Sequence, residues 1–91
     1  MREATEYRRL TYGEFCRTLK SEKIPDYETS LRLLVQIKKL HIRKSFKRVR
    51  RKKRKEIEGA LIMAVMAKMH HEDRGKREPE WFVREIERLK R

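Results

Sequence analysis

The sequence has no asparagine, one glutamine and one cysteine, with two prolines and three glycines in 91 residues. Because Cys16 is the single cysteine, no disulfide forms within the chain, which favours a reducing compartment. The longest apolar run, residues 60–67, is far shorter than the roughly 20 residues that cross a bilayer. The charged start of the chain lacks the apolar core of a signal peptide. We therefore expect a cytoplasmic protein with no membrane partner.

The residues that usually carry catalysis or bind cofactors are also scarce. The glycines lie far apart, so no phosphate-binding loop is present. His70 and His71 are adjacent and would point about 100° apart on a helix, and no second ligand pair has zinc-like spacing. Most carboxylates have a Lys or Arg three or four residues away, as is usual on exposed helices. The sequence thus predicts no enzyme, with no catalytic residue, metal or cofactor.

Acidic residues are missing from one long segment, with none between Glu28 and Glu56. Within that segment, residues 43–55 hold ten Lys/Arg in thirteen positions. Counted from Arg32 the acid-free segment contains thirteen bases, which equals the net charge of +13. The excess positive charge is therefore localised, as in a protein that binds a polyanion.

Lys and Arg bind nucleic-acid phosphates and release condensed counterions, which makes affinity depend on salt. On one helix, eight of the ten bases would lie within about 160°. We expect these eight to contact a DNA or RNA backbone, whereas Lys52 and Lys53 lie off that face. Phe46 is the single aromatic residue of residues 43–55, which argues against base stacking and favours a duplex or a structured RNA. The candidate contacts are Arg43, Lys44, Lys47, Arg48, Arg50, Arg51, Arg54 and Lys55.

Other interpretations of the basic segment are open. A solvated charged face usually mixes both signs, whereas like charges alone destabilise a free helix. An anionic membrane surface or a nuclear-localisation signal would also use a basic run. A helix-turn-helix around Pro25 would place its recognition turn far from the bases. If the partner is DNA, we expect the protein to associate with the nucleoid.

Helical periodicity and a few breakers predict the fold. Thr11 and Glu14 form a capping box for a helix that ends near Ser21, and Asp26 is a good N-cap after Pro25. Residues 1–10 either extend the first helix or fray. A last helix starts at Pro79, with an apolar stripe of Phe82, Ile86 and Leu89.

Residues 27–58 contain neither Gly nor Pro, so they predict one long helix or two nearly continuous ones. An apolar stripe about 80° wide runs along its whole length, and its first half is apolar on the opposite side as well. The first half should therefore be buried on two faces, and the second should project the bases. Every second residue from Leu40 to Phe46 is apolar except Lys44, and this alternation permits a short strand instead. A further alternative is a break at residues 41–44, after which Ser45 would cap a new helix.

Residues 56–69 are apolar nearly all round, which predicts the most buried helix, with methionines as core filler. The alternative is a methionine-rich groove for a partner, and Gly59 would mark a kink or a close backbone contact. The sequence thus predicts a single all-α domain, residues 1–91, folded as a compact bundle of about four helices with one long, partly basic helix.

A second function remains open beside nucleic-acid binding. A chain this small could be a scaffold subunit of a larger nucleoprotein assembly, such as a replication or RNA-guided complex. Its methionine-rich and Trp81/Phe82 surfaces would then contact protein partners or a second copy of the chain. Abundant Glu, Lys and Arg with little Asn or Gln also fit a thermophile.

Overall fold

Side-chain caps begin the first two helices at the positions that the sequence predicts. The computed structural model describes residues 7–90, except for the side chains of Lys44 and Ser45. Thr11 and Glu14 form the expected capping box before α1 (Tyr12–Lys20), and Asp26 accepts a hydrogen bond from the Thr29 amide at the start of α2 (Tyr27–Ile42). Residues 7–10 are not helical, so the part of 1–10 that is described does not extend α1.

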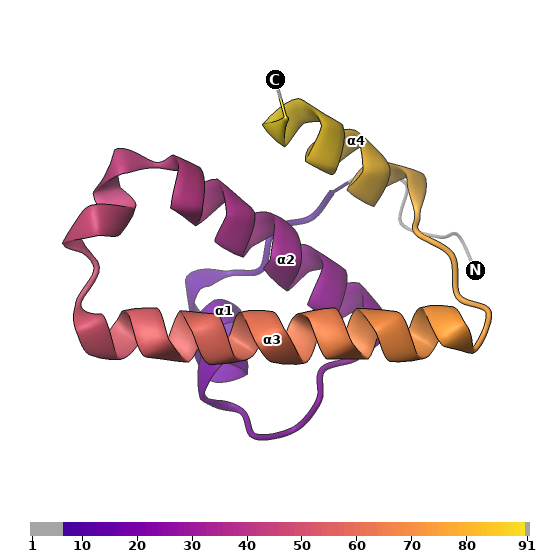
Figure 1. Cartoon of the computed structure of the whole chain (residues 1–91), viewed down its shortest axis with the longest axis horizontal. Coiled ribbons are helices and arrows are strands. Elements are labelled where there is room, and N and C mark those ends of the chain that lie inside the picture. Colours follow the sequence, from indigo (N-terminus) through magenta and orange to yellow (C-terminus); the bar gives the residue numbers. More distant parts are fainter. Residues whose placement is uncertain (1–6, 91) are drawn as a thin grey trace.

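The remaining elements are a short 3₁₀ helix and two α-helices. They are η1 (Lys44–Arg48), α3 (Arg51–Asp73) and α4 (Glu80–Leu89). No strand occurs among residues 7–90, so the strand considered for residues 40–46 does not form. The four α-helices form a compact bundle, as predicted (Figure 1).

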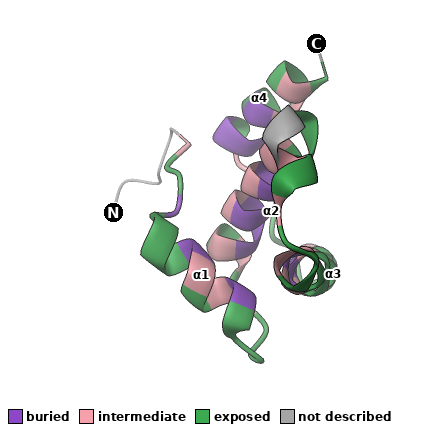
Figure 2. Ribbon diagram, turned by 90° about the vertical axis from the view of Figure 1, so that its left-hand side faces the viewer, coloured by how far each residue is buried: buried purple, intermediate pink, exposed green. Residues whose placement is uncertain are grey.

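The central element is α2, which is buried on two faces as the sequence predicts. Leu33 and Ile37 belong to a core cluster with Phe15 and Leu19 of α1 and with residues of α3. Leu31 and Val35 point to a second cluster, formed with Trp81 and Phe82 of α4. All four α2 side chains are almost completely buried, and Figure 2 shows buried segments along α2. The other helices therefore pack around α2.

Residues 27–58 do not form one long helix but belong to two α-helices, the other possibility that the sequence left open, because the chain turns between Ile42 and Arg51. Arg43 has extended backbone angles, and its amide donates to the carbonyls of Leu40 and Lys39, which ends α2. A straight helix of 32 residues would be about 48 Å long, whereas the molecule extends 39 Å along its longest axis. The turn brings Ile57 and the small residues of α3 back onto α2.

The prediction that residues 56–69 form the most buried helix is also wrong. One face of α3 is buried, through Ile57, Ala60, Ala64 and Ala67, whose mostly small side chains let the helix lie close to α2. The opposite face is exposed: Ile62, Val65, Met66 and Met69 retain 41–61% of their accessible surface. Met66 and Met69 are therefore not core filler, and α3 lies at the edge of the bundle (Figure 2).

Residues 70–75 are polar, which predicts a loop, but the loop begins only after Asp73. His70 and His71 are still helical, and α3 continues to Asp73. Gly75 follows with φ of 101°, a left-handed conformation that glycine adopts at no steric cost. The last helix begins one residue after the predicted start, with Pro79 as its N-cap.

A hydrogen-bond network joins α2, the end of α3 and the loop before α4. The Tyr27 hydroxyl donates to Glu72 Oε2 over 2.8 Å, and Lys68 Nζ donates to Glu72 Oε1 and to Glu78 Oε1. Burial alone would raise the pKa of Glu72, but the hydrogen bonds from Lys68 and Tyr27 hold that pKa below its usual value. The network thus stabilises the folded state while Glu72 is ionised.

Replacing Tyr27 with Phe removes the hydroxyl donor and should lower the free energy of unfolding by about 1.5 kcal/mol at neutral pH. Since the pKa of Glu72 is lowered on folding, its contribution is present above the ordinary carboxyl pKa and is lost as pH falls through the folded value. Urea unfolding followed by circular dichroism should therefore show a smaller difference between wild type and Tyr27→Phe near pH 3. An equal difference at both pH values would contradict this role for Glu72.

Candidate functional site

The basic residues 43–55 do not share a helical face but surround the turn between α2 and α3. We call residues 43–55 the basic corner; it lies at one end of the molecule, at the left of Figure 1. The corner comprises the C-cap of α2, all of η1, the link at Val49–Arg50 and the first five residues of α3. The eight predicted contacts come from three elements instead of one helix. They still gather at the same end of the bundle.

Most of these side chains face solvent. Lys52 is as exposed as the predicted contacts, although the sequence placed it off the main face, and Lys53 is half-buried. The predicted contact Lys44 has its side chain outside the described residues. The exposed bases of the corner are Arg43, Lys47, Arg48, Arg50, Arg51, Lys52 and Lys55.

Arg54 is a structural residue, unlike the other predicted contacts. Its Nη2 donates to the carbonyl of Lys47 over 2.6 Å and to that of Phe46 over 3.3 Å. The guanidinium also lies 5.4 Å from the centre of the Phe46 ring, and its Nε is buried. Arg54 therefore connects α3 to η1 and offers little of its guanidinium to a phosphate. This role could not be predicted from the sequence, because residues 46 and 54 become neighbours only through the turn between α2 and α3.

Apolar contacts hold the basic corner on the bundle. Phe46 and Val49 pack against the core cluster that α1, α2 and α3 share. The edge of the His41 ring meets the Phe46 ring, with centroids 4.6 Å apart. Lys53 Nζ lies 3.6 Å from Sγ of the half-buried Cys16, so this base points towards α1. The corner is thus anchored, and its exposed charges have a defined position.

The start of α3 lies inside the basic corner and lacks a side-chain cap. Arg50 is its N-cap residue and makes no capping hydrogen bond, and no acid occurs in the first turn. Free amides and the helix dipole make a helix start electropositive, so the cations around it are unfavourable in the absence of an anion. A phosphate near this turn would relieve the repulsion and could accept from the free amides.

Acidic partners are rare in the corner and common elsewhere. Among the described residues, the one ion pair within it joins Lys53 to Glu56, at 3.9 Å. In α4, by contrast, Glu80 pairs with Arg84, and Glu85 pairs with both Arg88 and Lys39. The positive field is therefore concentrated at one end of the bundle.

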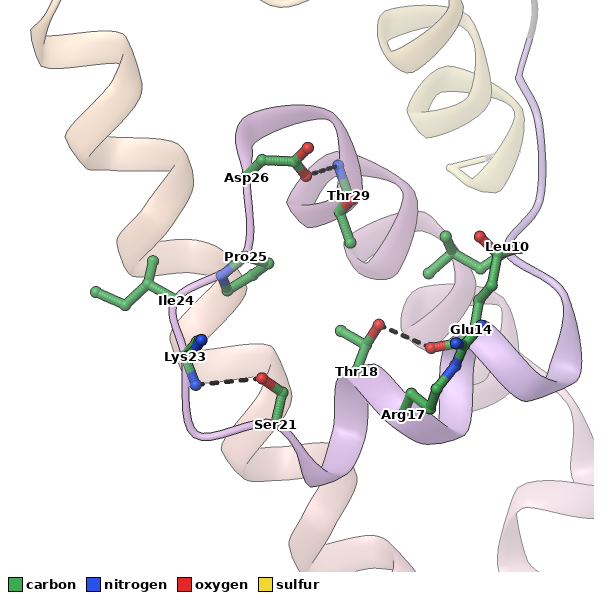
Figure 3. Close-up of a pocket in the computed structure, with 10 residues that line it drawn as sticks. All are labelled: Leu10, Glu14, Arg17, Thr18, Ser21, Lys23, Ile24, Pro25, Asp26 and Thr29. Atoms are coloured by element: carbon green, nitrogen blue, oxygen red, sulfur yellow. Dashed lines mark hydrogen bonds between the residues drawn. The ribbon is translucent and has the colours of Figure 1, made fainter.

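A hollow lies elsewhere, between α1 and the segment that leads into α2 (Figure 3). It has a volume of about 460 Å³, and its charged lining residues are two acids, Glu14 and Asp26, and two bases, Arg17 and Lys23. One oxygen of each carboxylate accepts a backbone amide at a helix start, from Thr11 and from Thr29. The charges of this lining therefore balance, unlike those of the basic corner.

The described residues form neither a metal cluster nor a membrane-spanning helix. Within the described part of the chain, no group of three or more His, Cys, Asp or Glu residues could hold a metal ion. The rings of His70 and His71 lie 5.7 Å apart, and the His71 ring also packs against Tyr27. None of the described helices is long and apolar enough to span a membrane.

Comparison of the chain with protein-family models, with curated proteins and with solved structures finds no match. The candidate site therefore rests on its own residues: an anchored turn with seven exposed bases.

Replacing Arg54 with Gln should destabilise the fold by about 2 kcal/mol, because the hydrogen bonds from a charged donor to two η1 carbonyls are lost. Arg51→Gln is the matched control: it also removes one charge, but from an exposed side chain at the start of α3. Its stability should stay equal or rise by about 0.5 kcal/mol, since a cation there opposes the helix dipole. Thermal and urea unfolding would measure both variants. Equal stabilities would show that Arg54 has no structural role.

Proposed function

We propose that this protein binds the phosphate backbone of a nucleic acid through the basic corner, without catalysing a reaction. The observation that carries the proposal is the set of seven exposed bases around one anchored turn. Each phosphate that a Lys or Arg neutralises releases condensed counterions, which supplies most of the binding free energy of such contacts. Holding the bases on a folded turn also reduces the side-chain and backbone entropy lost on binding.

The contacts that we propose differ slightly from those predicted from the sequence. Arg43, Lys47, Arg48, Arg50, Arg51 and Lys55 remain, Lys52 joins them because it is exposed, and Lys44 remains on sequence grounds. Arg54 supports the corner from within. Arg can donate two hydrogen bonds to one phosphate, whereas Lys contributes a more mobile point charge.

The surroundings of Phe46 favour a duplex or a structured RNA as the partner. Its ring is half-buried and already contacts His41 and Arg54. Proteins that bind single strands without sequence preference stack successive bases on exposed aromatic rings. The described part of the basic corner offers no such ring, so recognition would depend on backbone phosphates.

A scaffold function is the second candidate, and one observation favours it. The exposed apolar residues of α3 form a surface that a protein partner could cover. The Trp81/Phe82 surface expected for this function is a wrong prediction, because these side chains are only 4% and 5% exposed. They form the core with α2, so the scaffold function would depend on the exposed apolar residues of α3.

Binding to a short duplex, a single strand and a structured RNA should be measured over a range of salt concentrations. Contacts to about six phosphates predict a log–log slope near −5 on duplex DNA. A triple variant, Lys47→Gln, Arg48→Gln and Arg51→Gln, should reduce the magnitude of this slope by about 3. It should remain folded, because all three side chains are exposed.

The matched control removes three positive charges from exposed side chains far along the chain from the corner: Lys20→Gln, Lys76→Gln and Lys90→Gln. Its slope should stay close to that of the wild type, since these residues make no proposed contact. Absence of binding at low salt would refute the proposal. An equal loss in both triple variants would show that net charge, and not the corner, determines binding.

A further inference from the structure

The outward face of α3 has an apolar stripe that no described part of the chain covers. Ile62, Val65, Met66 and Met69 recur at i, i+3, i+4 and i+7, the spacing of one helical face. They retain 60%, 41%, 59% and 61% of their accessible surface. We call these four residues the α3 stripe. Isolated exposed apolar residues are common on proteins, but a contiguous row of them along one face marks an interaction surface.

Charged residues continue this face at both ends of the stripe. On a helix with 100° per residue, Lys55 and Asp73 fall on the same side as Ile62 and Met66. Both are exposed, Lys55 in the second turn of α3 and Asp73 at its last residue. Exposed Arg51 and Glu58 also fall on this side, and the residue opposite Glu58 in an antiparallel pair centred on the stripe is His70. The outward face of α3 thus has a base, Lys55, and an acid, Glu58, before the stripe and an acid, Asp73, after it.

This arrangement is complementary to itself when two copies run antiparallel. The register that places Ile62 opposite the second copy's Met66 also places Lys55 opposite the second copy's Asp73, twice by symmetry. A parallel pair would instead oppose Lys55 to Lys55 and Asp73 to Asp73, which is repulsive. Antiparallel helices also align their dipoles favourably. The Lys55–Asp73 pairs thus favour a second copy of this chain as the partner, bound in the antiparallel orientation.

Gly59 is a second feature that the single chain does not explain. It lies within α3, where glycine is less favourable than alanine, and a Cβ at this position would meet nothing within 4 Å. Neither the kink nor the close contact expected from the sequence accounts for it, since α3 is continuous and the space around it is open. In the antiparallel register Gly59 lies opposite the second copy's Met69, and the missing side chain leaves room for this long one.

We propose that the protein forms an antiparallel dimer through the α3 stripe, with reciprocal Lys55–Asp73 ion pairs at its ends. The proposal goes beyond nucleic-acid binding and does not depend on it: Lys55, a proposed phosphate contact, would pair with Asp73 in the dimer, and the other six exposed bases of the corner would stay available to phosphates. One helical face on each chain makes a small interface, below about 1,200 Å² in total, so the dimer should be in concentration-dependent equilibrium with the monomer.

Sedimentation equilibrium of the full chain, without nucleic acid, should detect this equilibrium between about 5 µM and 1 mM. The double variant Ile62→Gln/Met66→Gln should raise the dissociation constant by at least about tenfold, because it makes the middle of the stripe polar. Ile42→Gln is the matched control: Ile42 is 58% exposed but lies at the end of α2. It should leave the dissociation constant unchanged. Circular dichroism should show both variants folded.

A charge exchange tests the antiparallel register. Lys55→Glu should weaken the dimer about fivefold, and Lys55→Glu/Asp73→Lys should restore it, because the two pairs are re-formed with reversed signs. A chain that stays monomeric at the highest concentration would overturn the proposal, as would a dimer insensitive to Ile62→Gln/Met66→Gln. A double charge variant as weak as the single one would overturn the antiparallel pairing. None of these results depends on phosphate binding, so the two proposals can fail separately.

Discussion

The burial of α2 on two faces is the constraint on which the rest of the structure depends. Leu33 and Ile37 have to be buried against apolar side chains on one side of the helix, and Leu31 and Val35 on the other side. In a chain of 91 residues this cover comes from the segments on either side of α2, so the chain has to reverse direction soon after Ile42. The reversal falls within the most basic part of the sequence. The corner is therefore a consequence of how the core is closed.

Like charges at a tight turn repel, and the structure compensates for this repulsion with contacts to the core. Phe46 and Val49 pack inward, and Arg54 bonds the carbonyls of η1. These contacts hold the turn but do not neutralise its charge. The exposed bases still repel one another, and they lie close to the positive end of the α3 dipole, which is also unfavourable. Both terms become favourable when a polyanion binds. A solvated surface would gain nothing from this arrangement, which is the physical reason to connect the corner with phosphates.

The features that could be predicted from the sequence are those that local chemistry determines. The capping box at Thr11, the N-cap at Asp26 and the two-faced apolar pattern of α2 all depend on residues close together in the chain. Whether the helix breaks after Ile42 stayed open in the sequence, because a helical stripe continues through the break and the packing of distant residues decides against a straight helix. Residues 56–69 were predicted to be the most buried helix for a related reason. Their composition shows that they are apolar, but it does not show which side of the helix packs against α2. Four apolar side chains of that helix, Ile62, Val65, Met66 and Met69, stay exposed. Arg54, predicted to bind phosphate, instead supports the turn.

The α3 stripe and the basic corner are linked through the geometry of α3. This helix has 23 residues, so it spans about 34 Å. The corner lies at its start, so an antiparallel pair joined through the stripe would carry one corner near each end. In the register that pairs Lys55 with Asp73, the two starts of α3 are offset by 26 residues, or about 39 Å. The two corners would therefore face the same way along a duplex at a spacing somewhat longer than its roughly 35 Å helical turn. Each corner alone would bind phosphates weakly at physiological salt, whereas two on one rigid pair would bind with a high effective concentration. The apolar face of α3 would then decide how strongly the charged corner can act.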